Sequence, residues 1–327
     1  MREDPHAGYG RPPKHTRPRT KERPDYSDAA RAAIITIDRG RYHCLLLDSD
    51  ATLTAVKARP LGKKAVIVGD QVRVVGDLTG AEGTLARIVA VEERKTVLRR
   101  TADDDDPFER PIVANADQLA IVTALADPPP RPGMIDRVLV AAYDAGIAPL
   151  LILTKADLAD ADWLVDIYRP LGVPVLAVEP EANLAEVRQA LCGHSTVFVG
   201  HSGVGKSTLV NALIPGANRV TGAVNDVTGR GRHTSTSAHA LRLPPPGGVV
   251  IDTPGIRSFG LSHVTIESVI AAFPDLAEIV ADCPRGCLHE EGAEDCALDI
   301  ATANGDLAIE RLESFRRMGK AWETPSY

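Results

Sequence analysis

The sequence predicts a multidomain protein with three folded parts: a small β-barrel, a parallel α/β domain and a helical domain with a metal site. Its 327 residues suffice for two or three domains. Short β-type runs come first, apolar runs alternating with helical stretches follow, and a cysteine-rich stretch interrupts the last helical region. The expected boundaries are a disordered basic tail at 1–31, the barrel at 32–103, the α/β domain at 104–260 and the helical domain at 261–327.

The barrel is predicted from six short apolar runs separated by Asp, Gly and Pro, at residues 34–37, 44–47, 51–56, 65–68, 71–75 and 84–91. Strand-type alternation is clearest at Val72 and Val74 around Arg73. Such strands suit a small antiparallel barrel, of which the RNA-binding OB-fold is one member. We expect its surface to expose Lys57, Arg59, Lys63 and Lys64.

The α/β domain is predicted from apolar runs that alternate with helical stretches, which is typical of a parallel sheet covered by helices. The runs are 119–124, 150–153, 175–178, 197–199 and 249–251, and the helices are 134–145, 184–191 and 207–213. The chain ends in an amphipathic helix with Ala308, Leu312 and Phe315 on one face.

Composition and charge limit the function classes. The chain is 44% hydrophobic and 25% charged, with no apolar run near the roughly 18 residues of a membrane helix and no apolar segment after Met1. We therefore expect a cytoplasmic protein with no membrane partner. The net charge of −7 divides into +7 over residues 1–100 and −14 over the rest. Both a polyanion-binding module and a merely solvated basic face fit this asymmetry, for the tail as well as the barrel.

The strongest motif is Gly200-His201-Ser202-Gly203-Val204-Gly205-Lys206-Ser207, between an apolar run and a helical stretch. It matches the phosphate-loop pattern in the strand-to-helix context that the motif requires. Glycines let backbone N–H groups point at the phosphates, the lysine ammonium binds the β- and γ-phosphates, and the serine hydroxyl ligates Mg²⁺. The sequence therefore predicts a nucleotide site here.

Two companion motifs follow other apolar runs. In Asp252-Thr253-Pro254-Gly255, the aspartate is suited to hold Mg²⁺ through water and the glycine N–H to contact the γ-phosphate. In Thr154-Lys155-Ala156-Asp157, the carboxylate can accept hydrogen bonds from N1–H and the N2 amino group of guanine. GTPases usually carry Asn where this chain has Thr154, so we expect weaker backbone-organising hydrogen bonds and a less strict guanine preference.

The order of the motifs predicts a circular permutation. In Ras-like GTPases the phosphate loop comes first and the base motif late, whereas here the base motif at 154–157 precedes the phosphate loop at 200–207. Permutation relocates the termini without altering the sheet. The segment after Gly255 then leads directly into the C-terminal domain.

The segment between the phosphate loop and Asp252 is the place for the first switch. Hydroxyls of Thr234 and Ser235 are candidates to complete the Mg²⁺ shell. Ile256 stands where Ras-type enzymes have the glutamine that orients water, so the catalytic group must come from elsewhere. His233 is the nearest candidate, and a surface histidine that faces phosphate or RNA is an equally open interpretation.

Three cysteines and one histidine crowd into fourteen residues, as Cys283-x3-Cys287-x-His289-x6-Cys296. Four nitrogen and sulfur ligands at this density suit one closed, tetrahedral, structural zinc site. We expect Cys44 and Cys192 to be core residues instead.

These motifs resemble the RsgA family of circularly permuted GTPases, over nearly the whole chain after residue 32. The resemblance rests on the 68–72 stretch, on the phosphate-side segments 200–208, 231–236 and 250–255, and on the Cys, Cys, His, Cys order. It implies an OB-fold, a permuted GTPase domain and a zinc domain. It assigns the catalytic role to His233, Mg²⁺ to Ser207, Thr234 and Ser235, zinc to Cys283, Cys287, His289 and Cys296, and GTP to Thr154, Lys155, Ala156, Asp157, Gly200, His201, Ser202, Gly203, Val204, Gly205, Lys206, Ser207, Thr208, Asp252 and Gly255.

Three departures from the family accompany the resemblance, one of which is Thr154 in place of the usual Asn. The family's usual zinc spacing is Cys-x4-Cys-x-His-x5-Cys, but the total length is kept here, so we expect metal binding to survive. The usual Ser-Ala of the fifth GTPase motif is not evident at residues 177–180.

The expected function is GTP hydrolysis stimulated by the small ribosomal subunit, late in that subunit's maturation. The partners are then GTP and GDP, the small subunit and its rRNA, and the protein acts as a monomer. A nucleotide-gated RNA-binding factor with negligible turnover, favoured by Ile256, and a phosphate-loop ATPase, favoured by Thr154, remain alternatives.

Overall fold

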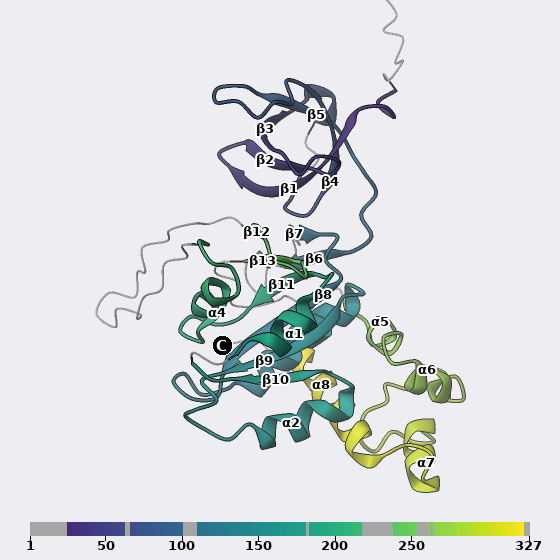
Figure 1. The fold of residues 1–327 in the computed structure, drawn as a ribbon. Coiled ribbons are helices and arrows are strands. Elements are labelled where there is room, and N and C mark those ends of the chain that lie inside the picture. Colours follow the sequence, from purple (N-terminus) through teal and green to yellow (C-terminus); the bar gives the residue numbers. More distant parts are fainter. Residues whose placement is uncertain are drawn as a thin grey trace, which may run out of the picture.

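A computed structural model gives the structure of the chain, and it describes residues 25–62, 66–100, 110–180, 183–217, 238–253, 261 and 264–323. Figure 1 shows the barrel at one end, the α/β domain in the middle and the C-terminal helices packed beside it. The expected boundaries at 103 and 260 fall outside the described residues, as do residues 1–24 of the tail expected at 1–31, and they stay predictions. The expected end of the tail at residue 31 is too late, because β1 begins at Ala30.

The barrel consists of five strands, β1 (Ala30–Asp38), β2 (Arg41–Leu46), β3 (Thr52–Lys57), β4 (Gln71–Gly76) and β5 (Ala86–Val91). Their order β1-β2-β3-β5-β4 closes because β4 also pairs with β1. Alternate residues point inward, so Ile34, Cys44, Val72 and Val74 are buried in its core. The predicted barrel and the core position of Cys44 are confirmed, with one refinement: β3 and β5 pair in parallel.

The prediction of a strand at 65–68 is wrong for its described part. Val66 and Ile67 lie outside any strand, and Val68 forms only an isolated bridge with Val113. These residues are apolar because they are buried, not because they pair in the barrel sheet. The turn that follows brings the Gly69 backbone so close to Ala114 that a Cβ would lie 2.0 Å from the Ala114 carbonyl oxygen.

A buried ion pair fixes this turn. The Asp70 side chain is fully buried, and Arg94, in the connection after the barrel, donates to both of its carboxylate oxygens at 2.6 and 2.9 Å. The Ile67 amide donates to the same carboxylate at 2.8 Å. Asn115 adds a bond to the Gly69 carbonyl oxygen at 2.9 Å. The turn is thereby held against the start of the α/β domain.

The α/β sheet has the strand order β10-β9-β8-β11-β13-β12. The first five are parallel, and β12 pairs antiparallel with β13. Their bounds are β8 (Gln118–Ala124), β9 (Ala148–Thr154), β10 (Val175–Val178), β11 (Ser195–Val199), β12 (His239–Arg242) and β13 (Val249–Asp252). Each predicted apolar run is a strand, and β12 is the one that no apolar run indicated.

Helices cover both faces of this sheet. The helix α1 (Pro132–Asp144) packs on one face with α2 (Asp162–Tyr168), while α3 (Ala185–Leu191) and α4 (Lys206–Leu213) pack on the other. Alternate strand residues divide between the two cores, as Leu151 and Ile152 of β9 do. The three predicted helices are confirmed, and α2 was not predicted.

A hairpin and an edge pairing join the barrel to the α/β domain. The hairpin of β6 (Val97–Arg100) and β7 (Arg110–Ala114) places Leu98 in the core on the α1 face. Thr36 of β1 pairs with His239 of β12, so the described barrel and α/β strands form one continuous sheet.

The C-terminal domain contains α5 (Ile266–Ile270), α6 (Pro274–Val280), α7 (Ala297–Asn304) and α8 (Ile309–Glu323). As predicted, Leu312 and Phe315 of α8 are buried, whereas Ala308, predicted on the same face, is exposed and precedes the helix. Phe315 meets Phe273 edge to face at 5.8 Å. Arg317 of α8 binds the buried Asp136 of α1 with two bonds of 3.2 Å. The helical domain is thus packed directly on α1.

Among the residues that the structure describes, no helix is both long enough and apolar enough to cross a membrane.

We expect Arg94→Ala to lower the free energy of unfolding by about 3 kcal/mol, because it leaves a buried carboxylate without its cation. Urea denaturation measures this loss. The matched control is Arg242→Ala, which removes the exposed ion pair to Asp50 at 2.7 Å; we expect it to leave the unfolding midpoint almost unchanged. Equal effects of the two substitutions would contradict this account of the turn.

Candidate nucleotide site and metal cluster

Three of the predicted motifs meet at one edge of the α/β sheet. The strands β9, β11 and β13 are parallel, so their carboxyl ends lie at the same edge, where β9 ends at Thr154 and β13 at Asp252. The phosphate loop follows β11 and leads into α4. The order along the chain therefore does not prevent the motifs from meeting.

The phosphate loop approaches its neighbours through glycines. A Cβ on Gly200 would lie 2.4 Å from the Val122 carbonyl oxygen, which excludes any side chain there. Gly205 has φ +87°, a left-handed conformation that favours glycine, and immediately precedes α4. Val204 is buried, whereas Ser202, Gly203 and Thr208 are exposed and His201 and Ser207 are half-buried. The loop thus has a buried anchor and an open outer surface.

Lys206 connects the phosphate loop to the end of β13. Its Nζ donates to the Asp252 carboxylate at 2.6 Å and to the Thr253 carbonyl oxygen at 3.0 Å. Asp252 is 6% exposed, so this is a largely desolvated ion pair. The Thr253 hydroxyl in turn donates to the Phe198 carbonyl oxygen of β11 at 2.8 Å. The two motifs are therefore held in register by side chains as well as by strand pairing.

Thr154 connects the base motif to the phosphate loop. Its Oγ1 lies 2.5 Å from the Val204 carbonyl oxygen and 3.2 Å from that of Thr123. A hydroxyl carries a single proton, so it donates to one of these carbonyls at a time, and Val204 is the nearer. Asn would offer two N–H donors at this position. The organising bond to the phosphate loop is thus retained here, with one donor instead of two.

The rest of the base motif forms a turn. Lys155 adopts the left-handed φ of +55°, and its Nζ donates to the Asp127 carbonyl oxygen in the loop between β8 and α1. The Ala156 amide donates to the Val178 carbonyl oxygen of β10 at 3.2 Å. Asp157 lies exposed on this turn, where its carboxylate is accessible to a ligand.

Sequence reasoning missed Arg188, which supports the phosphate-loop helix. From α3 its guanidinium donates to the carbonyl oxygens of Leu213 at 2.7 Å and Ala212 at 2.9 Å. These carbonyls end α4, which has only eight residues. A cation there satisfies terminal acceptors and opposes the helix dipole. No local sequence pattern indicates this role, because the two acceptors are more than twenty residues from Arg188 along the chain.

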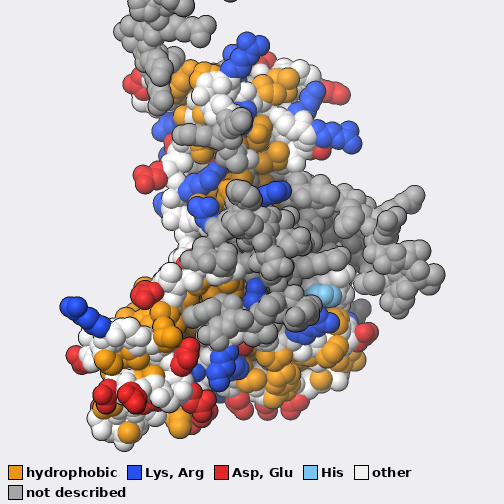
Figure 2. All heavy atoms as spheres, turned by 180° about the vertical axis from the view of Figure 1, so that it is seen from behind, with side chains coloured by type: hydrophobic (Ala, Val, Ile, Leu, Met, Phe, Trp, Pro, Cys, Tyr) orange, Lys and Arg blue, Asp and Glu red, His pale blue; other side chains and the backbone are white. Residues whose placement is uncertain are grey.

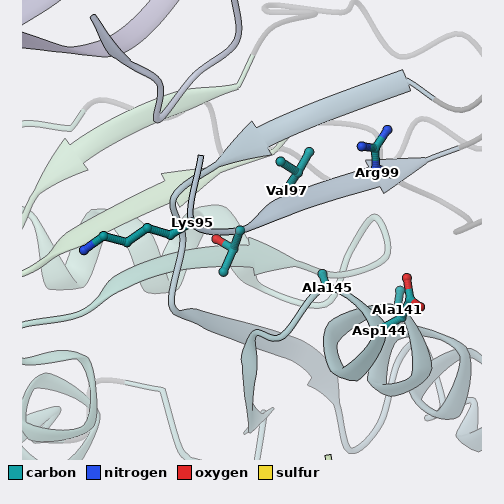
Figure 3. A pocket seen from close by; sticks show the side chains of 7 residues that line it. Lys95, Val97, Arg99, Ala141, Asp144 and Ala145 are labelled. Carbon is teal, nitrogen blue, oxygen red and sulfur yellow. The ribbon is translucent and has the colours of Figure 1, made fainter. Parts of the chain in front are cut away.

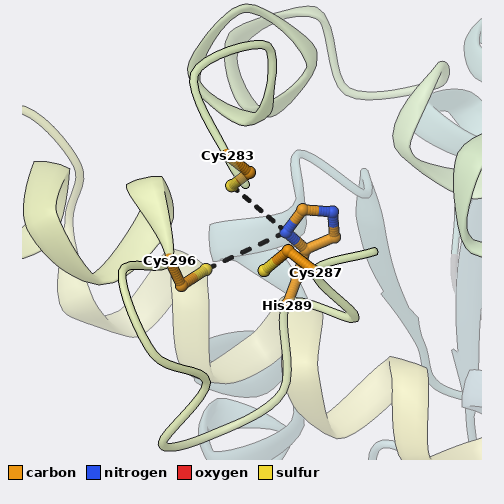
Figure 4. Close-up of side chains that lie close together, drawn as sticks. All are labelled: Cys283, Cys287, His289 and Cys296. Atoms are coloured by element: carbon orange, nitrogen blue, oxygen red, sulfur yellow. Dashed lines mark hydrogen bonds between the residues drawn. The ribbon is translucent and has the colours of Figure 1, made fainter. Parts of the chain in front are cut away.

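The four predicted metal ligands come together in the C-terminal domain (Figure 4), and their ligand atoms all lie within 4.8 Å of one another. The His289 Nδ1 is 3.5 Å from the Cys283 Sγ and 3.9 Å from the Cys296 Sγ. Bond lengths of about 2.3 Å to sulfur and about 2.0 Å to nitrogen give ligand separations of roughly 3.5 to 3.8 Å at tetrahedral angles. The cluster therefore fits a metal ion in spite of the altered spacing.

Burial shifts the pKa values of the cluster in opposite directions. Burial raises the pKa of the Cys283 thiol, and the neighbouring Cys296 and Cys287 add to this effect. Burial lowers the pKa of His289, which keeps the imidazole in its neutral, ligating form. A bound dication stabilises the thiolates that burial disfavours. The Ala297 amide also donates to the Cys283 sulfur at 3.3 Å.

Comparisons with known proteins agree with this geometry. The family model described as RsgA GTPase matches residues 91–262. A protein of Pseudomonas aeruginosa (strain LESB58) named "Small ribosomal subunit biogenesis GTPase RsgA" is 43% identical over 263 residues, which cover 78% of this chain and 75% of that protein. A protein of the same name from Alcanivorax borkumensis is 41% identical over 76% of this chain and 71% of its own length. The chain belongs to the RsgA GTPase family.

Solved structures extend the likeness to the fold. The crystal structure of YloQ, described as a circularly permuted GTPase, superposes with a TM-score of 0.65 at 26% identity, covering 92% of this chain and 98% of YloQ. YjeQ from Thermotoga maritima gives 0.64 at 23% identity over 91% and 99%, which concerns the fold alone. The predicted permutation is confirmed, and the RsgA GTPase family is a family of GTP-hydrolysing enzymes.

Several residues assigned from the resemblance lie outside the described residues. These are His233, Thr234, Ser235 and Gly255. Their roles remain expectations from the RsgA family. The structure brings together Thr154, Lys206 and Asp252, and the four metal ligands, but it does not test what each residue binds.

A separate hollow lies between β6 and α1 (Figure 3). It is lined by Lys95, Thr96, Val97, Arg99, Ala141, Asp144 and Ala145. None of these is a predicted site residue, and in Figure 3 the Lys95 side chain extends away from Asp144. The polar side chains of this hollow do not point toward a common centre. The hollow is also separate from the sheet edge where the nucleotide motifs meet.

We expect Thr154→Val to weaken GDP binding about tenfold, equivalent to about 1.4 kcal/mol, because the Val204 carbonyl loses its donor. Titration with a fluorescent GDP analogue measures the Kd. Thr154→Ser keeps the hydroxyl and should bind GDP like the unaltered protein. An unchanged Kd in the valine variant would show that this bond does not organise the site.

Proposed function

We propose that this protein hydrolyses GTP and acts in the biogenesis of the small ribosomal subunit. The observation that carries the proposal is the meeting of the phosphate loop, Asp252 and the base motif at one sheet edge, in a chain of the RsgA GTPase family. The relatives' names supply the ribosomal role. The proposal also includes action on the small subunit late in its maturation.

Lys206 is the proposed phosphate ligand, and Ser207 and Asp252 are the proposed Mg²⁺ ligands. The Lys206 ammonium, which donates to Asp252 at 2.6 Å, is the proposed cation for the β- and γ-phosphates of GTP. Asp252 and Ser207 are then positioned to hold Mg²⁺, Asp252 through water. Mg²⁺ neutralises the charge that develops on the transferred phosphoryl group.

Asp157 is the residue proposed to recognise guanine. Its exposed carboxylate accepts from N1–H and the N2 amino group, a pair of donors that adenine does not present on that edge. The left-handed turn at Lys155 places the lysine stem beside the base, and the ammonium donates to the Asp127 carbonyl oxygen. Thr154 fixes the turn relative to the phosphate loop, so base and phosphates are bound at a set distance.

His233 is the proposed catalytic residue, and Thr234 and Ser235 complete the Mg²⁺ shell. His233 is favoured because Ile256, at the water-orienting position, has no polar group. The histidine also belongs to the first switch segment. An imidazole near its pKa can orient or deprotonate the attacking water. Binding to the ribosomal subunit then places the switch segment, which accounts for stimulated turnover.

The barrel is the proposed rRNA-binding module. On the face drawn in Figure 2, Lys and Arg side chains project from the barrel. The exposed arginines include Arg39, Arg41, Arg59 and Arg87. Cations of this kind bind phosphates with little sequence preference. The proposal also states that the protein is a monomer and that it is located in the cytoplasm.

Zinc is the proposed metal of the Cys283, Cys287, His289 and Cys296 cluster. Three thiolates and one imidazole in tetrahedral separation suit zinc, and with four protein ligands the site has no open position for chemistry. The metal then has a structural role: it holds together a polar loop that buries little apolar surface.

The test of the proposed function is GTP turnover by the purified protein, alone and with small ribosomal subunits, at low and physiological salt. We expect subunits to stimulate phosphate release, and salt to weaken the stimulation because phosphate contacts carry it. Tight GTP binding without stimulated turnover would contradict the proposal. It would favour the nucleotide-gated RNA-binding factor that Ile256 suggests.

We expect His233→Ala to lower the subunit-stimulated rate about 100-fold or more, the usual contribution of general acid–base catalysis. GDP affinity, measured separately, should be retained. Full stimulated turnover in this variant would remove His233 from the mechanism and leave the rest of the site intact.

We expect elemental analysis of the purified protein to find about one zinc per chain, from the four-ligand set. Cys283→Ser should lower the zinc content and the thermal stability of the C-terminal domain. Cys192→Ser, at a half-buried cysteine outside the cluster, is the control and should keep its zinc. A zinc-free native protein that is equally stable would contradict the structural role.

A further inference from the structure

Arg316 of α8 lies against the metal cluster without being one of its ligands. Its side chain is 13% exposed, and its guanidinium makes four hydrogen bonds. It donates to the carbonyl oxygens of His289 at 2.9 Å and Glu290 at 3.0 Å. It also donates to both carboxylate oxygens of Asp299, at 2.8 and 2.7 Å.

These bonds join the two segments that supply the ligands. His289 belongs to the loop with Cys283 and Cys287, whereas Asp299 lies in the first turn of α7, directly after Cys296. A planar guanidinium with five N–H donors can hold both segments at once. The distance between the His289 and Cys296 ligand atoms therefore depends on Arg316.

The backbone of His289 adopts an uncommon conformation, and Arg316 donates a hydrogen bond to its carbonyl oxygen. Its φ is +58°, a left-handed conformation that is unfavourable for a residue with a Cβ. The imidazole Nδ1 faces the cysteine sulfurs from this conformation (Figure 4). Because Arg316 binds the carbonyl of the same residue, it holds the peptide that sets the direction of the ring.

The charge of Arg316 is also suited to the cluster. A dication with three thiolates and a neutral imidazole carries a net charge of −1. Arg316 donates to both carboxylate oxygens of Asp299, and a guanidinium stays protonated in proteins. The guanidinium is therefore a permanent cation beside an anionic centre.

We propose that Arg316 is a positioning residue for the metal centre: it orients His289 toward the three thiolates and so raises metal affinity. This inference rests on the proposed metal site. Residues that orient metal ligands typically contribute 10- to 100-fold in affinity.

Arg311 provides a matched control on the same helix. It also makes a bidentate bond to an aspartate, Asp275, at 2.6 and 2.7 Å, and donates to a backbone carbonyl, that of Pro170, at 2.6 Å. None of its partners belongs to the metal loop. Its loss removes three such bonds from α8, against four for Arg316, without touching the cluster.

The test compares Arg316→Gln with Arg311→Gln in the full chain. The metal is removed and replaced by Co²⁺, whose visible absorption reports tetrahedral thiolate ligation, and Zn²⁺ affinity is measured by competition with a chromogenic chelator. We expect Arg316→Gln to bind Zn²⁺ about 10- to 100-fold more weakly and to alter the Co²⁺ spectrum. We expect Arg311→Gln to keep both properties.

Two further variants keep the inference testable if Arg316→Gln does not fold. Arg316→Lys retains the charge but not the planar fork, and Asp299→Asn leaves the arginine without its carboxylate; both should lose affinity to an intermediate degree. GDP affinity checks that the GTPase domain is intact in each. Equal losses in the Arg316 and Arg311 variants, or unchanged Zn²⁺ affinity in every Arg316 variant, would overturn the inference. A protein that binds no metal before substitution would instead refute the metal site itself.

Discussion

The parallel pairing of β9, β8, β11 and β13 is the constraint on which the site depends. Parallel strands direct their carboxyl ends to one edge, so the residues that follow β9, β11 and β13 meet there in whatever order the chain visits them. The contacts of Lys206 with Asp252 and of Thr154 with Val204 both follow from this arrangement. A permuted chain therefore keeps one nucleotide site, because moving the termini leaves every strand pairing in place.

The permutation also decides what the additional domains touch. The barrel precedes β8 and reaches the sheet at β12, through the pairing of Thr36 with His239. The helical domain follows β13 and packs on α1, where Arg317 binds Asp136. The loop that precedes α1 carries Asp127, the acceptor for Lys155 of the base motif. Both domains are thus packed against elements that begin or end beside the nucleotide site.

Sequence reasoning succeeded where local pattern and structure share a cause. Continuous apolar runs predicted the parallel strands because both faces are buried, and the cysteine pattern predicted four side chains that the structure brings together. It failed at residues 66–68, which are buried just before the turn at Gly69, and at β12, a short strand without an apolar run. The roles of Arg94, Arg188 and Arg316 were not predictable, because each binds groups brought near only by the tertiary fold.

We propose that this edge of the sheet binds a guanine nucleotide through Asp157 and the phosphate loop. The most direct measurement is competition between GTP and ATP for displacement of a bound fluorescent GDP analogue. The account predicts that ATP requires at least about 100-fold higher concentration than GTP, since adenine leaves the Asp157 carboxylate without its donors. Displacement by GTP and ATP at similar concentrations would contradict it, and would assign the site to a phosphate-loop ATPase instead.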